Sequence, residues 1–98
     1  MNRKRGEDKA ITIEKANSTF IQPYVTEKTF NDIERENKLT FIVSEKSTKK
    51  EIIEALKLVY EADALEVNTA RTIQGKKAVI KFSSAGGARE LATRLGLV

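Results

Sequence analysis

The clearest pattern of hydrophobic and polar positions is an amphipathic stripe in the middle of the chain. Its apolar members are Ile52, Leu56, Val59 and Tyr60, with Ile53 alongside. This spacing follows the 3.6-residue period of an α-helix. Thr48 and Glu51 stand three residues apart directly before the stripe, which is the signature of a capping box. The pattern therefore predicts a helix that opens at Thr48.

Four segments have the composition of β-strands. Lys38–Val43 places Leu39, Phe41 and Val43 on one face. The other segments are Ser18–Gln22, which ends at Pro23, and the longer Leu65–Ile73 and Lys76–Ser83. A tight turn at Gln74-Gly75 is expected to join the two longer segments into a hairpin, because glycine adopts the positive φ that such turns require.

Two shorter helices complete the pattern. The first has Thr26 at its N-cap, Glu27 in its first turn, and Phe30 and Ile33 facing the core, and it ends near Asn37. The second carries Ala88, Leu91, Ala92 and Leu95 on one side, with Gly96 placed to end it. The order β-α-β-α-β-β-α indicates one α+β domain, with a four-stranded sheet packed against helices.

Residues 1–18 show neither helical nor strand periodicity. This segment contains five cations and three anions, so it is mildly basic. Two interpretations stay open, namely a disordered tail and an arm that becomes ordered only against RNA phosphates. The folded domain is expected to comprise residues 19–98.

The composition excludes several kinds of chemistry. The chain has 98 residues, which fits one domain, and contains neither cysteine nor histidine. Disulfides, thiolate nucleophiles, imidazole bases and the usual zinc sites are therefore ruled out. We expect no cofactor, no metal and no small-molecule substrate. The charged start lacks the apolar run of a secretory signal, and no stretch is apolar enough to span a membrane, so a cytoplasmic protein is expected.

Positive charge is concentrated in the expected hairpin. Residues 67–83 contain Arg71, Lys76, Lys77 and Lys81 and no acidic residue, and this charge equals the +4 of the whole chain. The remainder of the sequence is electrically balanced. A localised positive field predicts a polyanionic partner, and nucleic acid is the commonest one.

The second strand of the hairpin separates lysines from apolar residues. Lys77, Val79 and Lys81 share one face, and the intervening residues Ala78, Ile80 and Phe82 share the other. One interpretation is a lysine-bearing surface that binds an anionic partner. The alternative is that lysines on an edge strand only prevent edge-to-edge pairing.

The partner strand adds hydrogen-bond donors to this surface. Asn68, Thr69, Arg71 and Thr72 carry groups suited to phosphates and ribose hydroxyls. Phe41 and Phe82 fall on apolar faces, so the paired aromatic residues of a base-stacking sheet are missing. The pattern favours a surface that reads the backbone and shape of folded, double-stranded RNA.

Catalytic interpretations have little support. Glu27 beside Lys28, or the pair Glu51 and Glu54, would supply carboxylates for acid–base chemistry. A capped helix start and a solvated helix face explain the same residues better. Residues 85–89, Ala-Gly-Gly-Ala-Arg, match no glycine-rich nucleotide motif, so a flexible link is favoured over a phosphate cradle.

Four segments resemble the universal large-subunit ribosomal protein twenty-three family. They are Pro23-Tyr24-Val25-Thr26-Glu27-Lys28, Asn37-Lys38-Leu39-Thr40-Phe41-Ile42-Val43, Val67-Asn68-Thr69 and Lys76-Lys77-Ala78-Val79-Ile80-Lys81. Each is a weak signal alone, but the four in this order and spacing are specific. The likeness covers about residues 19–98, and Phe82 stands where the family usually has leucine.

The resemblance implies a β-α-β-α-β-β fold with an antiparallel sheet, and binding to large-subunit (23S) rRNA beside the exit of the polypeptide tunnel. Family members there neighbour large-subunit protein twenty-nine. They also offer a docking site to the signal recognition particle, the protein translocon and, in bacteria, trigger factor. The family's factor-docking glutamate falls on Glu27. Bacterial members carry a long basic extension at the hairpin turn, so the short Gln74-Gly75 turn resembles archaeal or eukaryotic members, and the brief N-terminal segment favours archaeal ones.

We therefore expect a non-catalytic ribosomal scaffold protein. Its candidate RNA-binding residues are Lys28, Lys38, Asn68, Thr69, Arg71, Lys76, Lys77 and Lys81, and Glu27 is the candidate docking residue. Two rival hypotheses stay open. One is a free-standing α+β interaction module whose lysine-bearing strand binds an acidic protein, and the other is a small hydrolase that uses carboxylates.

Overall fold

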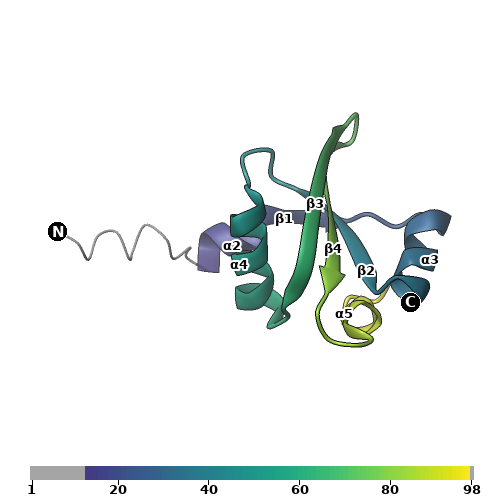
Figure 1. The fold of residues 1–98 in the computed structure, drawn as a ribbon. Helices are drawn as coiled ribbons and strands as arrows, with labels where there is room; N and C mark the ends of the chain where they lie inside the picture. The colour runs from purple at the N-terminus through teal and green to yellow at the C-terminus, as the bar shows by residue number, and fades with distance from the viewer. Residues whose placement is uncertain (1–12, 98) are drawn as a thin grey trace.

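The computed structural model describes residues 13–97 and contains eight elements in that range (Figure 1). They are α2 (Ile13–Thr19), β1 (Phe20–Pro23), α3 (Glu27–Arg35), β2 (Lys38–Val43), α4 (Lys49–Tyr60), β3 (Ala64–Thr72), β4 (Gly75–Phe82) and α5 (Gly87–Arg94). The predicted α+β class is confirmed, and the predicted order of elements is confirmed from β1 onward. No helix among the described residues is long and apolar enough to cross a membrane.

The four strands form one antiparallel sheet in the order β1-β2-β4-β3. Leu39 pairs with Ile80, which pairs with Val67, so these three side chains point to the same face. We call it the helix face, because buried residues of α3, α4 and α5 pack on it. The core comprises Leu39, Phe41, Val43, Val67, Ala78, Ile80 and Phe82 of the sheet with Ile33, Ile52, Leu56, Ala88, Leu91 and Ala92 of the helices.

The opposite side of the sheet is called the open face. Its members are the alternate residues Lys38, Thr40 and Ile42 of β2, Lys77, Val79 and Lys81 of β4, and Asn68 and Ala70 of β3. The predicted alternation of β4 is confirmed, since Ala78, Ile80 and Phe82 are buried on the helix face. β2 departs from the expected single buried face, because Thr40 and Ile42 are only 2% and 4% exposed. β2 lies between β1 and β4, so its side chains are covered by neighbouring strands on the open face as well, although that face also carries lysines.

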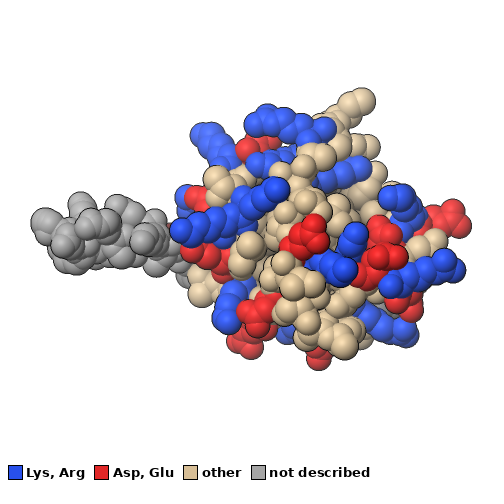
Figure 2. Space-filling view, in the orientation of Figure 1, with Lys and Arg blue, Asp and Glu red and all other residues tan. Residues whose placement is uncertain are grey.

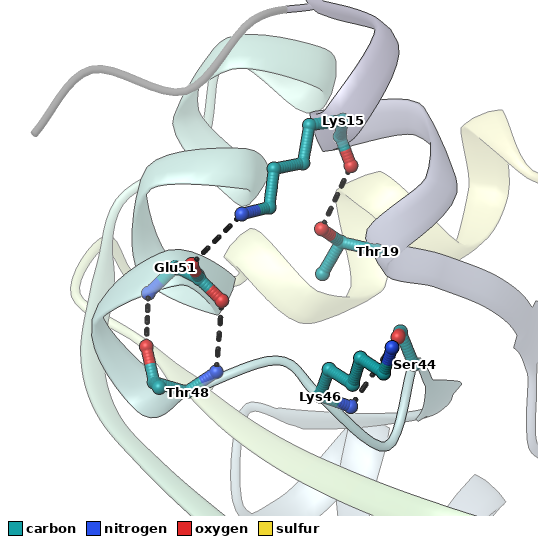
Figure 3. A network of polar contacts seen from close by, with 6 residues as sticks. All are labelled: Lys15, Thr19, Ser44, Lys46, Thr48 and Glu51. Carbon is teal, nitrogen blue, oxygen red and sulfur yellow. Dashed lines mark hydrogen bonds and ion pairs between the residues drawn. The ribbon is translucent and has the colours of Figure 1, made fainter. Parts of the chain in front are cut away.

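Both predicted N-caps are confirmed. At α4, Glu51 N donates to Thr48 Oγ1 at 3.2 Å and Thr48 N donates to Glu51 Oε1 at 3.1 Å (Figure 3). At α3, Thr29 N donates to Thr26 Oγ1 at 3.2 Å, and Thr29 Oγ1 accepts from Thr26 N. Each box satisfies helix-start N–H groups that have no partner within the helix.

Residues 13–18 fall in the segment that was predicted to be an N-terminal tail. In the structure they belong instead to helix α2, which packs against α4. Ala16 is fully buried, and Lys15 forms an ion pair with Glu51 at 3.1 Å (Figure 3). A helix of seven residues is too short to be stable alone, so its stability comes from this packing and not from a local pattern. The strand predicted at Ser18–Gln22 consequently begins later, at Phe20. Residues 1–12 of the expected tail lie outside the described residues.

Two predicted core positions are partly exposed. Ile33 of α3 is buried as expected, but Phe30 is 38% exposed. In α4, Ile52 and Leu56 are buried, whereas Ile53 is 40% exposed. Both residues lie at the margin of the apolar stripe of their helix and remain in contact with solvent.

The hairpin turn lies one residue earlier than predicted. Thr72 pairs with Gly75, so Ile73 and Gln74 form the loop and Gly75 is the first residue of β4, with φ of 126°. Thr72 Oγ1 closes the turn by donating to Gly75 O at 2.8 Å. Ile73 is 101% exposed at the tip, which in Figure 1 projects beyond the rest of the domain.

The side chain of Asn37, which follows α3, forms hydrogen bonds to the end of β4, to the link after it and to the start of α5. Its Nδ2 donates to Phe82 O at 3.1 Å and to Ser84 O at 2.8 Å, and its Oδ1 accepts from Ala88 N at 2.9 Å. The residue has a φ of 58°, in the left-handed region that asparagine tolerates better than most residues. Asn37 therefore fixes the end of α3, the end of β4 and the start of α5 relative to one another.

The link before α5 differs from the expected flexible segment. Gly87 is buried, and a Cβ added there would lie 2.8 Å from Ser84 Oγ and 3.0 Å from Phe82 Cβ. This glycine therefore permits close packing. The first turn of α5 is bound by Asn37, which fits a structural role for the segment and not the phosphate cradle that was the weaker alternative. Gly96, with φ of 78°, follows the end of α5 as predicted.

Candidate nucleic-acid interface

The open face brings together cations from three elements. Lys38 of β2 pairs with Lys81 of β4, and Lys77 lies four residues before Lys81 on the same side of β4. Lys28 of α3 lines the same surface hollow as Lys77. Asn68 pairs with Val79 and so belongs to this face as well. Five of the eight predicted RNA-binding residues thus share one surface.

The other three predicted residues lie on the opposite side of the hairpin. Lys76 pairs with Val43 and Arg71, and Thr69 pairs with Ala78, so all three point to the helix side. Lys76 Nζ donates to Ser47 O, and Arg71 lies 3.5 Å from Glu45 Oε1. The hairpin therefore does not present its cations as a single strip.

The contacts of Lys76 and Arg71 create a second basic region. They bring the hairpin against the loop between β2 and α4, where Lys46 is exposed, and near the start of α4, where Lys49 and Lys50 are exposed. Figure 2 shows Lys and Arg gathered over the upper part of the view, above α4 and around the hairpin tip. Over the lower part, basic and acidic residues alternate. Counting charge along the hairpin sequence alone missed this region.

Acidic neighbours reduce the isolation of the hairpin charge. Glu66 pairs with Lys81 across β3 and β4, and Glu66 Oε2 accepts from Asn68 Nδ2 at 3.3 Å. Glu45 approaches Arg71 from the loop before α4. Residues 67–83 contain no acid, but the fold supplies two from outside that range, Glu66 from the adjacent position in the chain and Glu45 from a distant loop. Lys77 and Lys38 have no acidic residue opposite them in the sheet pairing.

Tyr24 is a half-buried aromatic residue beside the open face, outside the set of RNA-binding residues predicted from charge. Lys77 Nζ lies over its ring, 3.8 Å from the centroid, in a cation–π contact. Tyr24 N donates to Thr40 O at 2.9 Å, which holds the backbone of this residue against β2. No sequence pattern links Tyr24 to Lys77, because they are far apart in the chain and meet only through the sheet.

Glu27 occupies the position expected for it. It is the first residue of α3, directly after the Thr26 cap, and it is exposed. A carboxylate in the first turn interacts favourably with the helix dipole. Its exposure leaves the side chain accessible to a partner.

Glu51, one of the carboxylates considered for catalysis, has a structural role at the start of α4. Glu51 accepts from Thr48 N and from Lys15 Nζ at 3.1 Å each (Figure 3). The hydrogen bond from the Thr48 backbone, followed by the one from Lys15, lowers the pKa of Glu51 below its usual 4.5. An acid that stays ionised in a capping box is a poor proton donor at neutral pH. This geometry gives the hydrolase hypothesis no support.

A model of the family described as ribosomal protein L23 matches residues 18–92. The chain belongs to the ribosomal protein L23 family. The resemblance inferred from four sequence segments is thereby confirmed, and the chain is a protein of the large ribosomal subunit.

Curated relatives of the ribosomal protein L23 family support the same assignment. The chain is similar to the large ribosomal subunit protein uL23 of Haloarcula marismortui, with 41% identity over 76 residues, covering 76% of this chain and 89% of the relative. The uL23 of Methanococcus vannielii is 47% identical over 76 residues, covering 76% and 88%. That of Methanosphaera stadtmanae is 41% identical over 81 residues, covering 82% and 94%. All three organisms are archaea, in agreement with the archaeal-like short hairpin.

Proposed function

We propose that this protein is a non-catalytic scaffold of the large ribosomal subunit that binds large-subunit (23S) rRNA through the open face of its sheet. The observation that carries the proposal is the cluster of Lys28, Lys38, Lys77 and Lys81 at that face, two of which face no acid in the sheet pairing. Lysines on a rigid sheet bind phosphates without reading sequence, as a structured RNA backbone requires.

Membership of the ribosomal protein L23 family extends the proposal to location and partners. The protein would act in the cytoplasm, beside the exit of the polypeptide tunnel and next to large-subunit protein twenty-nine. The second basic region, formed by Lys76, Arg71 and the start of α4, would contact an adjoining RNA segment. Thr69 lies on the same side of the hairpin and would contribute a hydroxyl donor there.

A binding titration against large-subunit rRNA fragments over a salt series tests this function. If the four open-face lysines each neutralise one phosphate, raising salt from about 50 to about 200 mM should weaken binding roughly a hundredfold. A random duplex RNA of equal length serves as the competitor. A flat salt response, or equal affinity for the random duplex, would contradict the proposal and favour the rival hypothesis of a module for acidic proteins.

Glu27 is proposed as the docking residue for factors that meet the nascent chain, such as the signal recognition particle and the protein translocon. Its exposure at the start of α3 supports this role. Glu27→Ala should reduce recruitment of the signal recognition particle to ribosomes while leaving incorporation of the protein intact. The helix-dipole contribution lost is only about 0.3–1 kcal/mol, so the fold should persist.

Glu90→Ala is the matched control for Glu27→Ala, because Glu90 is also an exposed first-turn acid, on α5. Both variants lose one charge and one dipole contact. Co-sedimentation of the signal recognition particle with ribosomes that carry each variant separates a docking role from a general charge effect. Equal recruitment by the two kinds of ribosome would refute the docking role of Glu27.

A further inference from the structure

A surface hollow lies between the start of α3 and the open face. Tyr24 and Val79 supply apolar surface, and Lys28, Asp32, Thr40 and Lys77 supply polar groups around it. The two ammonium groups outnumber the single carboxylate. This combination of an aromatic ring, an aliphatic side chain, cations and one acceptor differs from the lysine row of the open face, by which we mean Lys38 and Lys81.

The aromatic ring of the hollow is held in place before any ligand arrives. Lys77 Nζ lies 3.8 Å from the ring centroid of Tyr24, and the Tyr24 backbone is hydrogen-bonded to Thr40 O. The same contact holds the Lys77 ammonium group over the ring, and both residues line the hollow. The ammonium group covers one face of the ring, so a flat base would pack against the remaining surface of Tyr24 while the cation meets the phosphate of the same nucleotide.

The carboxylate of Asp32 restricts the kinds of ligand that the hollow can bind. An ionised carboxylate only accepts hydrogen bonds, so it favours a ligand edge that carries N–H groups. Nucleobases present such groups on their Watson–Crick edges, and these edges are free only when the base is unpaired. An acidic peptide would place its own carboxylates next to Asp32 and has no flat face for Tyr24.

We propose that the hollow binds one unpaired nucleotide of the rRNA, with its base against Tyr24, its N–H edge at Asp32 and its phosphate between Lys28 and Lys77. This inference rests on the proposed function and deepens it. The lysine row grips the backbone of folded RNA, whereas the hollow fixes the position of the protein along that RNA. A base that leaves the helix at one place supplies a landmark that a uniform backbone lacks.

Nucleotide-resolution chemical probing of large-subunit rRNA fragments tests the hollow separately from the lysine row. The wild-type protein should protect one unpaired nucleotide in addition to a backbone footprint. Tyr24→Leu keeps an apolar side chain but removes the ring, so it should weaken binding about tenfold and restore reactivity at that nucleotide. The slope of affinity against salt should stay the same, since no phosphate contact is removed. Tyr24→Phe should behave like the wild type.

Asp32→Asn provides a second readout that does not depend on the ring. It removes the negative charge and replaces one of the two acceptor oxygens by an NH2 donor of the same size, so it should weaken protection of the same nucleotide and leave the backbone footprint in place. If both Tyr24→Leu and Asp32→Asn bind and protect the RNA as the wild type does, the hollow holds no nucleotide, and the proposed function still stands. If the wild-type protein shows no preference for large-subunit rRNA, the proposed function itself fails.

Discussion

Replacing Lys77 and Lys81 together with alanine is expected to weaken binding to large-subunit rRNA by roughly thirtyfold at about 0.15 M salt, because two phosphate contacts are lost. The slope of log affinity against log salt should become shallower by about 2 units. Both side chains point away from the core, so the variant should fold as the wild type does. Filter binding over a salt series measures both quantities.

The double variant Lys57→Ala with Arg89→Ala is the matched control for charge. It also removes two positive charges, but from other places in the fold. Lys57 on α4 forms an ion pair with Asp63 at 3.0 Å, and Arg89 on α5 forms one with Glu34 at 2.8 Å. Its salt slope should equal that of the wild type. If the Lys77 and Lys81 variant kept the wild-type slope, or if the control lost as much, the open face would not be the surface that meets phosphate.

Asn37→Ala is expected to destabilise the domain by about 2–4 kcal/mol, the largest effect on folding that we predict for a single substitution. The change removes three hydrogen bonds, those to Phe82 O, Ser84 O and Ala88 N. It also places alanine at a φ of 58°, in the left-handed region that alanine adopts less readily than asparagine. The midpoint of urea unfolding, with the slope of the transition held constant, gives the difference in free energy.

Two further variants separate the contributions of Asn37. Asn37→Gly loses the same hydrogen bonds but accommodates the φ of 58°, so it should be about 1 kcal/mol more stable than Asn37→Ala. Asn37→Asp keeps an acceptor for Ala88 N and loses the Nδ2 donor. A cost below about 1 kcal/mol for Asn37→Ala would show that neighbouring groups or water replace these bonds.

Local signals in the sequence were sufficient for most of the fold. The capping box of Thr48 and Glu51 and the N-cap at Thr26 act within one helical turn, so their spacing alone predicts where α4 and α3 begin. The alternation in β4 is also local, because every second side chain must enter the core. These predictions were confirmed because the physical cause and the pattern occupy the same few residues.

Helix α2 shows where such reasoning fails. The contacts that hold it in the fold are with residues distant in the chain, as in the ion pair between Lys15 and Glu51, and the sequence shows no helical periodicity there. Similarly, Ile42 is buried on a face that the sequence pattern left to solvent. Tertiary packing decides both cases, and a single sequence does not display it.

The candidate site was predicted as a set of residue types and not as an arrangement. Grouping Lys76 with Lys77 by charge overlooked the alternation of a strand, which places neighbouring residues on opposite faces and was already visible in the sequence. In contrast, the contact of Lys77 with Tyr24 depends on how β1, β2 and β4 pair. The separation of the two basic surfaces was thus available from the pattern, whereas the hollow beside Tyr24 was not.

Among the residues that the structure describes, strand β3 forms one border of the sheet and pairs with β4 alone. Its outer backbone groups are therefore a template to which another extended chain could add, and the exposed Leu65 and Ile73 make such addition more favourable. In a newly made copy that is not yet assembled, the edge of β3 is exposed and can pair with another chain. Prompt incorporation, or a companion that shields this margin, would keep unassembled copies from aggregating.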